Sequence, residues 1–203
     1  MRILMIALLL GLLSGGVVQA QGDFKPNDDG FIRNWVILAP IPLDAGQSGA
    51  DGLGKQQVPD EARLHPKDGE KITVGDKELA WKKYEADDYF INFNTFLGRE
   101  TENSVGYAVC YLVADKEMPA LKMKTGSDDQ GKIYLNGKEI WKNSEARALE
   151  KDQDTTEDVT LKEGTNTLVF KVVNEGMDWS GCVRFIDKDG NPVKNLKVLL
   201  ARP

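Results

Sequence analysis

Acidic side chains occur in two short stretches with the spacing of potential metal ligands. Asp128 and Asp129 follow each other in a tight turn, and Asp152 and Asp154 occupy alternate positions further along. Hard cations such as calcium bind clustered oxygen ligands, so these four aspartates are candidate ligands of a structural calcium ion. The alternative is a structural role, because turn aspartates bond to nearby backbone amides and acidic runs commonly form a solvated face. No other cofactor is predicted.

Tryptophan, aspartate and arginine side chains supply the chemistry of a sugar-binding site. An indole ring stacks on the apolar face of a sugar while its N–H donates a hydrogen bond. Trp35 lies within a strongly apolar run and is expected in the core. The candidate ligand-binding residues are Trp81, Trp141, Trp179, Asp128, Asp129 and Arg147. Packing in the interior is the competing interpretation for each tryptophan, since large aromatic side chains are mostly buried.

Catalytic motifs are not found in this sequence. The single histidine, His65, has no serine, cysteine or aspartate partner at the spacing of a nucleophilic triad. Signatures of zinc hydrolases, nucleophile elbows and phosphate-binding loops are also absent after residue 20. The sequence therefore favours a protein without enzymatic activity. Because carboxylates are abundant, a glycan-acting hydrolase with two catalytic carboxylates is the third alternative.

Charge and a leader segment restrict the partners and the compartment. The net charge of −6, without a basic stripe, argues against a nucleic-acid partner and against anionic membrane surfaces.

Residues 1–20 have the pattern of a signal peptide, with Arg2 before an apolar run and small residues leading to Ala20. We expect cleavage after Ala20 and a secreted or periplasmic protein. An uncleaved membrane anchor is the alternative, but the apolar run is shorter than the roughly 20 residues that span a bilayer. Membrane insertion after cleavage is not expected, because no later segment has the pattern of a membrane span.

Two cysteines, Cys110 and Cys182, lie in apolar strand-like runs. An oxidising compartment permits a disulfide bond between them. The alternative is two buried free thiols that act as small apolar side chains.

Short strands must position these residues, because turn signals recur about every ten residues. Residues 105–113 are apolar at every second position on both faces, which predicts a strand buried in the middle of a sheet. Asn136-Gly137 is the preferred pair for a two-residue hairpin turn. This turn predicts that Ile133 faces Ile140, Tyr134 faces Glu139 and Leu135 faces Lys138.

The remaining chain predicts one domain over residues 31–203, preceded by a flexible segment at 21–30. Residues 71–81 have the pattern of a second hairpin, and residues 89–96 could form a strand. Residues 44–60 lack an apolar period and predict a long surface loop, with a helical turn near residues 59–62. The fold class predicted from this pattern is an all-β antiparallel sandwich.

Six sequence pieces occur in an order that resembles a known family. They are residues 31–40, 105–108, 126–129, 133–138, 161–166 and 179–184. In this order they resemble the galactose-binding-domain-like jelly rolls of secreted bacterial proteins, with the sugar-binding domain of family 2 glycoside hydrolases as the nearest named relative. The Ser-Asp-Asp turn before the Asn-Gly hairpin is also similar to PA14-type modules. The resemblance implies a jelly-roll sandwich and a non-catalytic, accessory role in carbohydrate recognition.

Two functions of different kinds follow as expectations. The first is a secreted carbohydrate-recognition module whose partner is a glycan or cell-surface polysaccharide. The second is a structural or protein-interaction domain of the cell envelope, whose partner is an exported protein and which has no small ligand.

Overall fold

Strand β6 (Ser104–Ala114) contributes apolar side chains to both of its faces, and this property explains the architecture. The computed structural model describes residues 23–203. In it Val105, Tyr107 and Val109 belong to one apolar cluster, whereas Ala108 and Cys110 belong to a second cluster on the other face. The buried central strand predicted for residues 105–113 is therefore confirmed.

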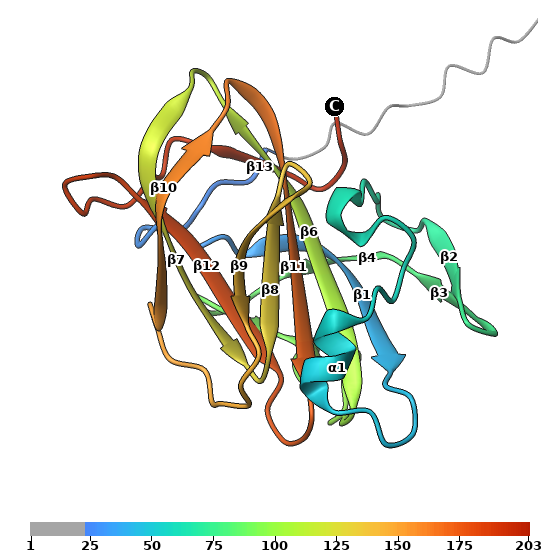
Figure 1. Ribbon diagram of the computed structural model, residues 1–203. Coiled ribbons are helices and arrows are strands. Elements are labelled where there is room, and N and C mark those ends of the chain that lie inside the picture. Colours follow the sequence, from blue (N-terminus) through green and yellow to red (C-terminus); the bar gives the residue numbers. More distant parts are fainter. Residues whose placement is uncertain (1–22) are drawn as a thin grey trace, which may run out of the picture.

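Antiparallel strands form two facing sheets, as Figure 1 shows. The larger sheet has the order β4 (Lys82–Glu85), β1 (Asn34–Pro42), β6, β11 (Gly164–Asn174), β8 (Gly131–Leu135) and β9 (Lys138–Asn143), and β13 (Lys197–Leu199) also pairs with β6. The smaller sheet has the order β10 (Asp154–Leu161), β7 (Met118–Asp128), β12 (Ser180–Ile186) and β5 (Ile91–Asn92). The chain crosses between the sheets from β6 to β7, from β7 to β8 and again around β11. The predicted all-β sandwich is confirmed, with the repeated crossing of a jelly roll.

The main core lies between the two sheets. Trp35, Phe170 and Phe185 meet there, and all three side chains are buried. The inner face of the larger sheet is matched by the alternate residues of β12, such as Val183 and Phe185. Truncating one such aromatic side chain to alanine typically costs about 3–5 kcal/mol, so this cluster dominates the stability of the sandwich.

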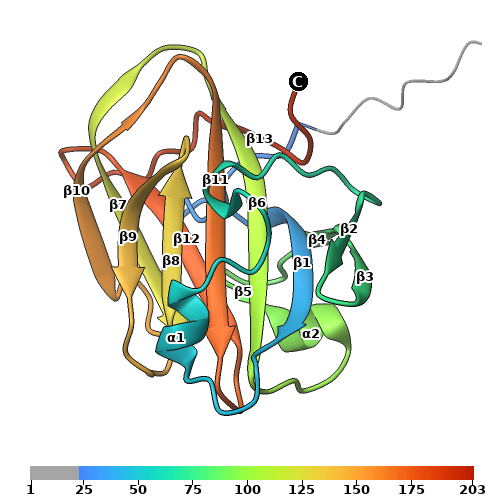
Figure 2. The same ribbon diagram turned by 45° about the vertical axis from the view of Figure 1, so that its right-hand side comes forward.

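The outer face of the larger sheet is covered by the excursion between β1 and β4. This excursion contains α1 (Gly49–Gly54), the 3₁₀ turn η1 (Glu61–Arg63) and the hairpin of β2 (Lys71–Val74) and β3 (Lys77–Ala80). Figure 2 shows α1 lying over the larger sheet, in front of β8 and β11. The predicted hairpin at residues 71–81 is confirmed, whereas the predicted loop at 44–60 is wrong over residues 49–54, which are helical.

A buried ion pair fastens this excursion to the sheet. Lys171 of β11 has no exposed side-chain surface, and its Nζ lies 3.1 Å from Oε2 of Glu61. The same ammonium donates hydrogen bonds to the carbonyl oxygens of Leu53 and Lys55. Tyr107 and Tyr134 donate their hydroxyl hydrogens to the Glu61 carboxylate at 2.5 and 2.8 Å. Because both charges have several partners, the network satisfies groups that would otherwise be costly to bury.

Three local expectations are corrected by the structure. The segment predicted as flexible at 21–30 is tied down where it is described, because Phe24 exchanges two backbone hydrogen bonds with Val198. The segment 89–96 is only briefly a strand and continues as the helix α2 (Phe93–Leu97).

In the Asn136-Gly137 hairpin, Ile133 faces Trp141 rather than Ile140, because a bulge shifts the register beyond Tyr134. The other two predicted pairs of this hairpin are confirmed.

The predicted signal peptide at residues 1–20 lies outside the described residues. Within residues 23–203, no helix is long and apolar enough to cross a membrane.

Both cysteines are buried free thiols, so of the two alternatives the structure has the second and not the disulfide bond. Cys110 belongs to the core between the sheets, together with Val183 and Phe185. Because successive residues of a strand point to opposite faces, Cys182 points away from that core, to the outer side of the smaller sheet. Burial raises the pKa of both thiols, that of Cys182 to about 12.

Candidate functional site

A pocket of about 250 Å³ opens where β5, β7 and β12 lie side by side. Its lining combines two carboxylates, an amide, a hydroxyl and two aromatic rings. The lining residues are Tyr89, Phe90, Asn92, Asp128, Ala148, Leu149, Asp178 and Ser180.

Strand register brings the polar groups of the pocket together. Ser180 pairs with Asp128 of β7 on one side and with Asn92 of β5 on the other. Directly paired residues of neighbouring strands project from the same face of a sheet, so these three side chains form a row. Asn92 also caps α2, because its side-chain oxygen accepts a hydrogen bond from the Thr95 amide at 2.9 Å. The row is therefore held by backbone pairing rather than by a mobile loop.

Asp128 is the most strongly perturbed acid of the pocket. Its side chain is only 8% exposed, and burial, followed by the neighbouring charge of Asp129, raises its pKa to about 6. Asp178 raises this pKa further, whereas the Leu149 amide lowers it. No side chain among residues 23–203 donates a hydrogen bond to Asp128. Its carboxylate consequently retains acceptor capacity that a bound hydroxyl or ammonium group would use.

Asp129 lies beside the pocket but is engaged elsewhere. The peptide bond between Asp128 and Asp129 is cis. The carboxylate of Asp129 accepts a hydrogen bond from the Glu175 amide at 2.8 Å. Burial raises the pKa of Asp129 as well. Of the two turn aspartates, Asp128 is thus the one available to a ligand.

The aromatic wall consists of Tyr89 and Phe90, whose ring centroids are 5.1 Å apart in an edge-to-face arrangement. Tyr89 also packs against Phe31 at 5.2 Å. Lys151 lies over both the Phe31 and Tyr89 rings, at 5.2 and 5.5 Å from their centroids. Such cation–π contacts attract the ammonium to the ring faces.

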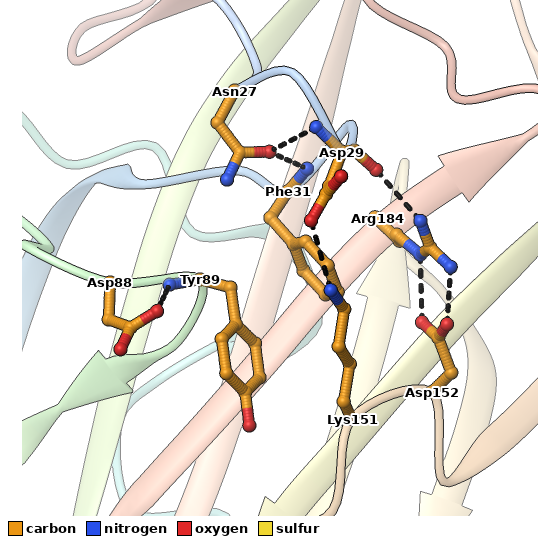
Figure 3. A network of polar contacts seen from close by, with 8 residues as sticks. All are labelled: Asn27, Asp29, Phe31, Asp88, Tyr89, Lys151, Asp152 and Arg184. Carbon is orange, nitrogen blue, oxygen red and sulfur yellow. Dashed lines mark hydrogen bonds and ion pairs between the residues drawn. The ribbon is translucent and has the colours of Figure 1, made fainter.

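Ion pairs of Lys151 and Arg184 lie behind the aromatic wall of Tyr89 and Phe90. Figure 3 shows Lys151 reaching Asp29, to which it donates a hydrogen bond at 2.9 Å. Arg184 binds both carboxylate oxygens of Asp152 and also donates to the backbone oxygen of Asp29. These contacts join the segment before β1, the segment before β10 and β12. They hold Lys151 in place over the Tyr89 ring and so support the aromatic wall from behind.

Two of the tryptophans expected to stack on a sugar are buried. Trp81 and Trp179 are 2% and 0% exposed, so neither presents a ring face to the solvent. Trp179 stacks on Phe93 with centroids 4.7 Å apart, and Trp81 packs between the excursion and the outer face of the larger sheet. The prediction that these two residues form sugar platforms is wrong, because both rings fill the interior.

Trp141 is half-buried and lies apart from the pocket. Its ring meets Phe170 edge-on at 6.0 Å, and the Arg147 guanidinium lies 5.9 Å from its centroid. Arg147 in turn forms an ion pair with Asp154 at 2.5 Å. Trp141 and Arg147 therefore contact each other rather than a shared ligand cavity, and neither lines the pocket around Asp128.

The four aspartates expected to bind calcium do not converge. Asp152 is bound by Arg184 and Asp154 by Arg147, so each carboxylate already has a cationic partner. In the described part of the chain, no three acidic, histidine or cysteine side chains form a group that could hold a metal ion. The expected calcium site at these residues is not supported by the geometry.

Comparison of the chain with protein-family models and with curated proteins finds no match. The resemblance to galactose-binding-like jelly rolls stays a prediction, and the function has to be argued from the pocket itself.

Most of the pocket was not recognisable from the sequence. Asp128 was among the predicted residues, but Tyr89, Asn92, Asp178 and Ser180 were not. The aromatic pair Tyr89 and Phe90, which follows two aspartates in a turn, was the one local signal that could have indicated it. The pocket is assembled from segments that are distant in the sequence, and strand pairing brings Asn92, Asp128 and Ser180 together.

Proposed function

We propose that this protein is a non-catalytic carbohydrate-recognition module whose binding site is the Asp128 pocket. The observation that carries the proposal is the combination of a row of polar acceptors and donors with an adjacent aromatic wall. Carbohydrates present hydroxyl groups at their rims and apolar C–H faces on their rings, and such a pocket complements both. The cavity of about 250 Å³ suits a single sugar unit rather than a long oligosaccharide.

Each part of the pocket has a defined role in this proposal. The ring of Tyr89 or Phe90 packs against the C–H face of the sugar. Asp128 and Asp178 accept hydrogen bonds from hydroxyl groups, and Ser180 can donate or accept. Because the acceptors are pre-positioned on paired strands, little ordering is needed on binding. The small contact area still limits the affinity of a single module to a modest value.

A glycan-array screen with residues 21–203, followed by calorimetric titration of the best ligand, tests the proposal. Asp128→Asn and Tyr89→Ala are each expected to weaken binding about tenfold or more, because they remove an ionised acceptor and the stacking face. Asp115→Asn is the matched control, since Asp115 is an exposed residue just before the other end of β7. A blank array, or equal binding by all three variants, would contradict the proposal.

A reducing-sugar assay with the same glycans separates recognition from hydrolysis. Asp128 and Asp178 line one pocket, which is the arrangement a two-carboxylate glycosidase requires. Binding without release of reducing ends supports the recognition module. Release that disappears in both Asp128→Asn and Asp178→Asn would identify an enzyme instead.

A second candidate function, docking of an exported protein, is favoured by a different observation. The edge strands β9 and β10 border a groove of about 510 Å³, with Ile140 and Val159 in its lining. Edge strands leave backbone N–H and C=O groups free to pair with an extended polypeptide. Binding of an exported partner that is lost in Ile140→Asp and kept in Asp128→Asn would select this function.

A further inference from the structure

A second cavity, of about 190 Å³, is basic although the chain as a whole is acidic. It lies at the rim of the larger sheet, on the face that the excursion covers. Two arginines, the single histidine, two threonines and the hairpin turn form its lining: Arg63, His65, Asn136, Gly137, Thr165, Thr167 and Arg202. No carboxylate appears in this lining among the described residues.

Four distant segments build the cavity. Arg63 ends η1 and His65 follows it, whereas Arg202 belongs to the C-terminal segment. Thr165 and Thr167 alternate along β11, so they project from the same face of the larger sheet as Lys171. The network of Lys171 and Glu61 fastens η1 to that face, which sets where Arg63 can lie.

The side chain of Arg63 packs closely against the hairpin turn at Gly137. A Cβ atom on Gly137 would lie 3.0 Å from Cγ and 3.2 Å from Nε of Arg63. Gly137 also has a φ of +83°, which side chains other than glycine seldom adopt. The aliphatic stem of Arg63 therefore rests against the turn, while its side chain as a whole stays 68% exposed, which leaves the guanidinium accessible to a ligand from solvent.

Two guanidinium groups and the imidazole border this cavity, and no carboxylate lines it among the described residues. Nη1 of Arg202 donates a hydrogen bond to Nε2 of His65 at 3.4 Å, so the imidazole is neutral at Nε2 in this arrangement. Burial, and then the charge of Arg202, lowers the pKa of His65, and only Asp60 raises it. Asp60 itself contacts Arg63 at 3.5 Å through largely exposed side chains, which is a weak pairing. An anion placed among the three groups would balance the two guanidinium charges and would favour the protonated form of His65.

We propose that the cavity binds a tetrahedral oxyanion, a phosphate or sulfate group, through Arg63, His65 and Arg202. Guanidinium groups present paired N–H donors that match two oxygens of such an anion, and they stay charged at all relevant pH values. The threonine hydroxyls add neutral donors on the sheet side. This site is separate from the Asp128 pocket, which lies on the smaller sheet, and it does not depend on the carbohydrate proposal.

The histidine offers a direct readout, because a chain with one histidine gives one imidazole Cε1–H signal. The untagged protein is titrated with pH by NMR in sodium sulfate and in sodium chloride of equal ionic strength. Sulfate is expected to raise the pKa of His65, since a bound anion stabilises the imidazolium form. Equal pKa values of His65 in the two salts would overturn the proposal, because general screening affects both salts alike.

Variants establish which side chains hold the anion. Arg63→Gln and Arg202→Gln are each expected to weaken sulfate binding about tenfold, as loss of a charge-assisted hydrogen bond does. Arg99→Gln replaces an exposed arginine outside the cavity and is expected to leave binding unchanged. A response to sulfate that is the same in all three variants would overturn the assignment to this cavity.

Two arms distinguish the source of the oxyanion. The first titrates inorganic phosphate, and the second titrates a sulfated dextran oligosaccharide against its unsulfated parent. Saturation by free phosphate alone identifies a site for the inorganic ion, whereas tighter binding of the sulfated oligosaccharide identifies an ester group on a glycan. Both outcomes support an oxyanion site. Failure of phosphate, sulfate and the sulfated oligosaccharide to shift the His65 signal would refute it.

Discussion

Asp128 and Ser180 face each other across the antiparallel pair of β7 and β12, and this pairing defines the floor of the candidate sugar site. The same register sets Asn92 on the other side of Ser180. A one-residue slip of β12 would move Ser180 to the opposite face of the sheet and remove it from the pocket. The register of β12 therefore decides whether Ser180 can contact a ligand in the Asp128 pocket.

The raised pKa of Asp128 predicts a defined dependence of stability on pH. Its pKa is about 6 in the folded chain and near 3.9 in an unfolded one. The folded state holds this proton more tightly, so the contribution of Asp128 to stability falls as pH rises from about 4 to 6. At pH 7 Asp128→Asn is expected to increase the free energy of unfolding by about 1–2 kcal/mol, and at pH 4 to leave it nearly unchanged. Urea unfolding at both pH values measures this, with Asp115→Asn as the control.

The buried pair of Lys171 and Glu61 predicts strongly coupled substitutions. Lys171→Met leaves the Glu61 carboxylate buried without its cation, which is expected to cost about 3–5 kcal/mol. Combining it with Glu61→Gln is expected to restore much of this loss, because no uncompensated charge is left. Chemical denaturation of the two single variants and the double variant gives the coupling energy.

An exposed ion pair serves as the comparison for this cycle. Arg33 and Glu85 lie 3.2 Å apart at the surface, with side chains that are 32% and 60% exposed. Their coupling energy is expected to be below about 1 kcal/mol, as for other surface pairs. Coupling of the buried pair that is no larger than this would show that the ion pair does not fasten the excursion.

The free thiols predict slow labelling in the native state. Cys110 and Cys182 are buried, and burial raises the pKa of both, so the reactive thiolate form is scarce. A thiol reagent is expected to modify neither cysteine rapidly until a denaturant is added, when both react. Reducing agent is expected to leave the melting temperature unchanged. A mass two units lower before reduction would reveal a disulfide bond and contradict the structure.

Close packing over β6 predicts a large effect from one added methyl group. A Cβ atom on Gly106 would lie 2.6 Å from the ring of Phe93 and 2.8 Å from that of Trp179. Gly106→Ala is therefore expected to destabilise the protein by about 1–3 kcal/mol, because two rigid rings must move. Gly54→Ala is the matched control, since no atom lies within 4 Å of the added methyl group there. Thermal unfolding of both variants measures the difference.

Alternation of apolar residues was sufficient to predict much of the fold. The two apolar faces of residues 105–113 placed this strand in the middle of a sheet, and Asn136-Gly137 located a hairpin correctly. The bulge beyond Tyr134 was not predictable, because the turn pair sets the register only for the residues next to it. The helix α1 was missed because its glycine-rich sequence has no apolar period, and it is held by its cap at Ser48 and by contacts with β11.

Because local patterns do not reveal packing between distant segments, predictions at the candidate site were also wrong. Trp81 and Trp179 have the residue type of a sugar platform, but residue type does not reveal which neighbours cover a ring. Cys110 and Cys182 are both apolar in context, yet Cys110 lies in the core between the sheets, whereas Cys182 projects from the outer side of the smaller sheet. Asp128 was identified because a turn aspartate is recognisable locally.

By itself, the sequence determined the strand-rich character, the main hairpins, the acidic balance and Asp128 as a candidate ligand contact. These properties follow from local patterns, since side-chain alternation and turn preferences act over a few residues. Only the tertiary structure decided which polar groups meet in the Asp128 pocket, which charges pair at Lys171 and which arginines approach His65. Such sites are formed by strand pairing and packing between distant segments, and these contacts depend on the whole core rather than on any one stretch of chain.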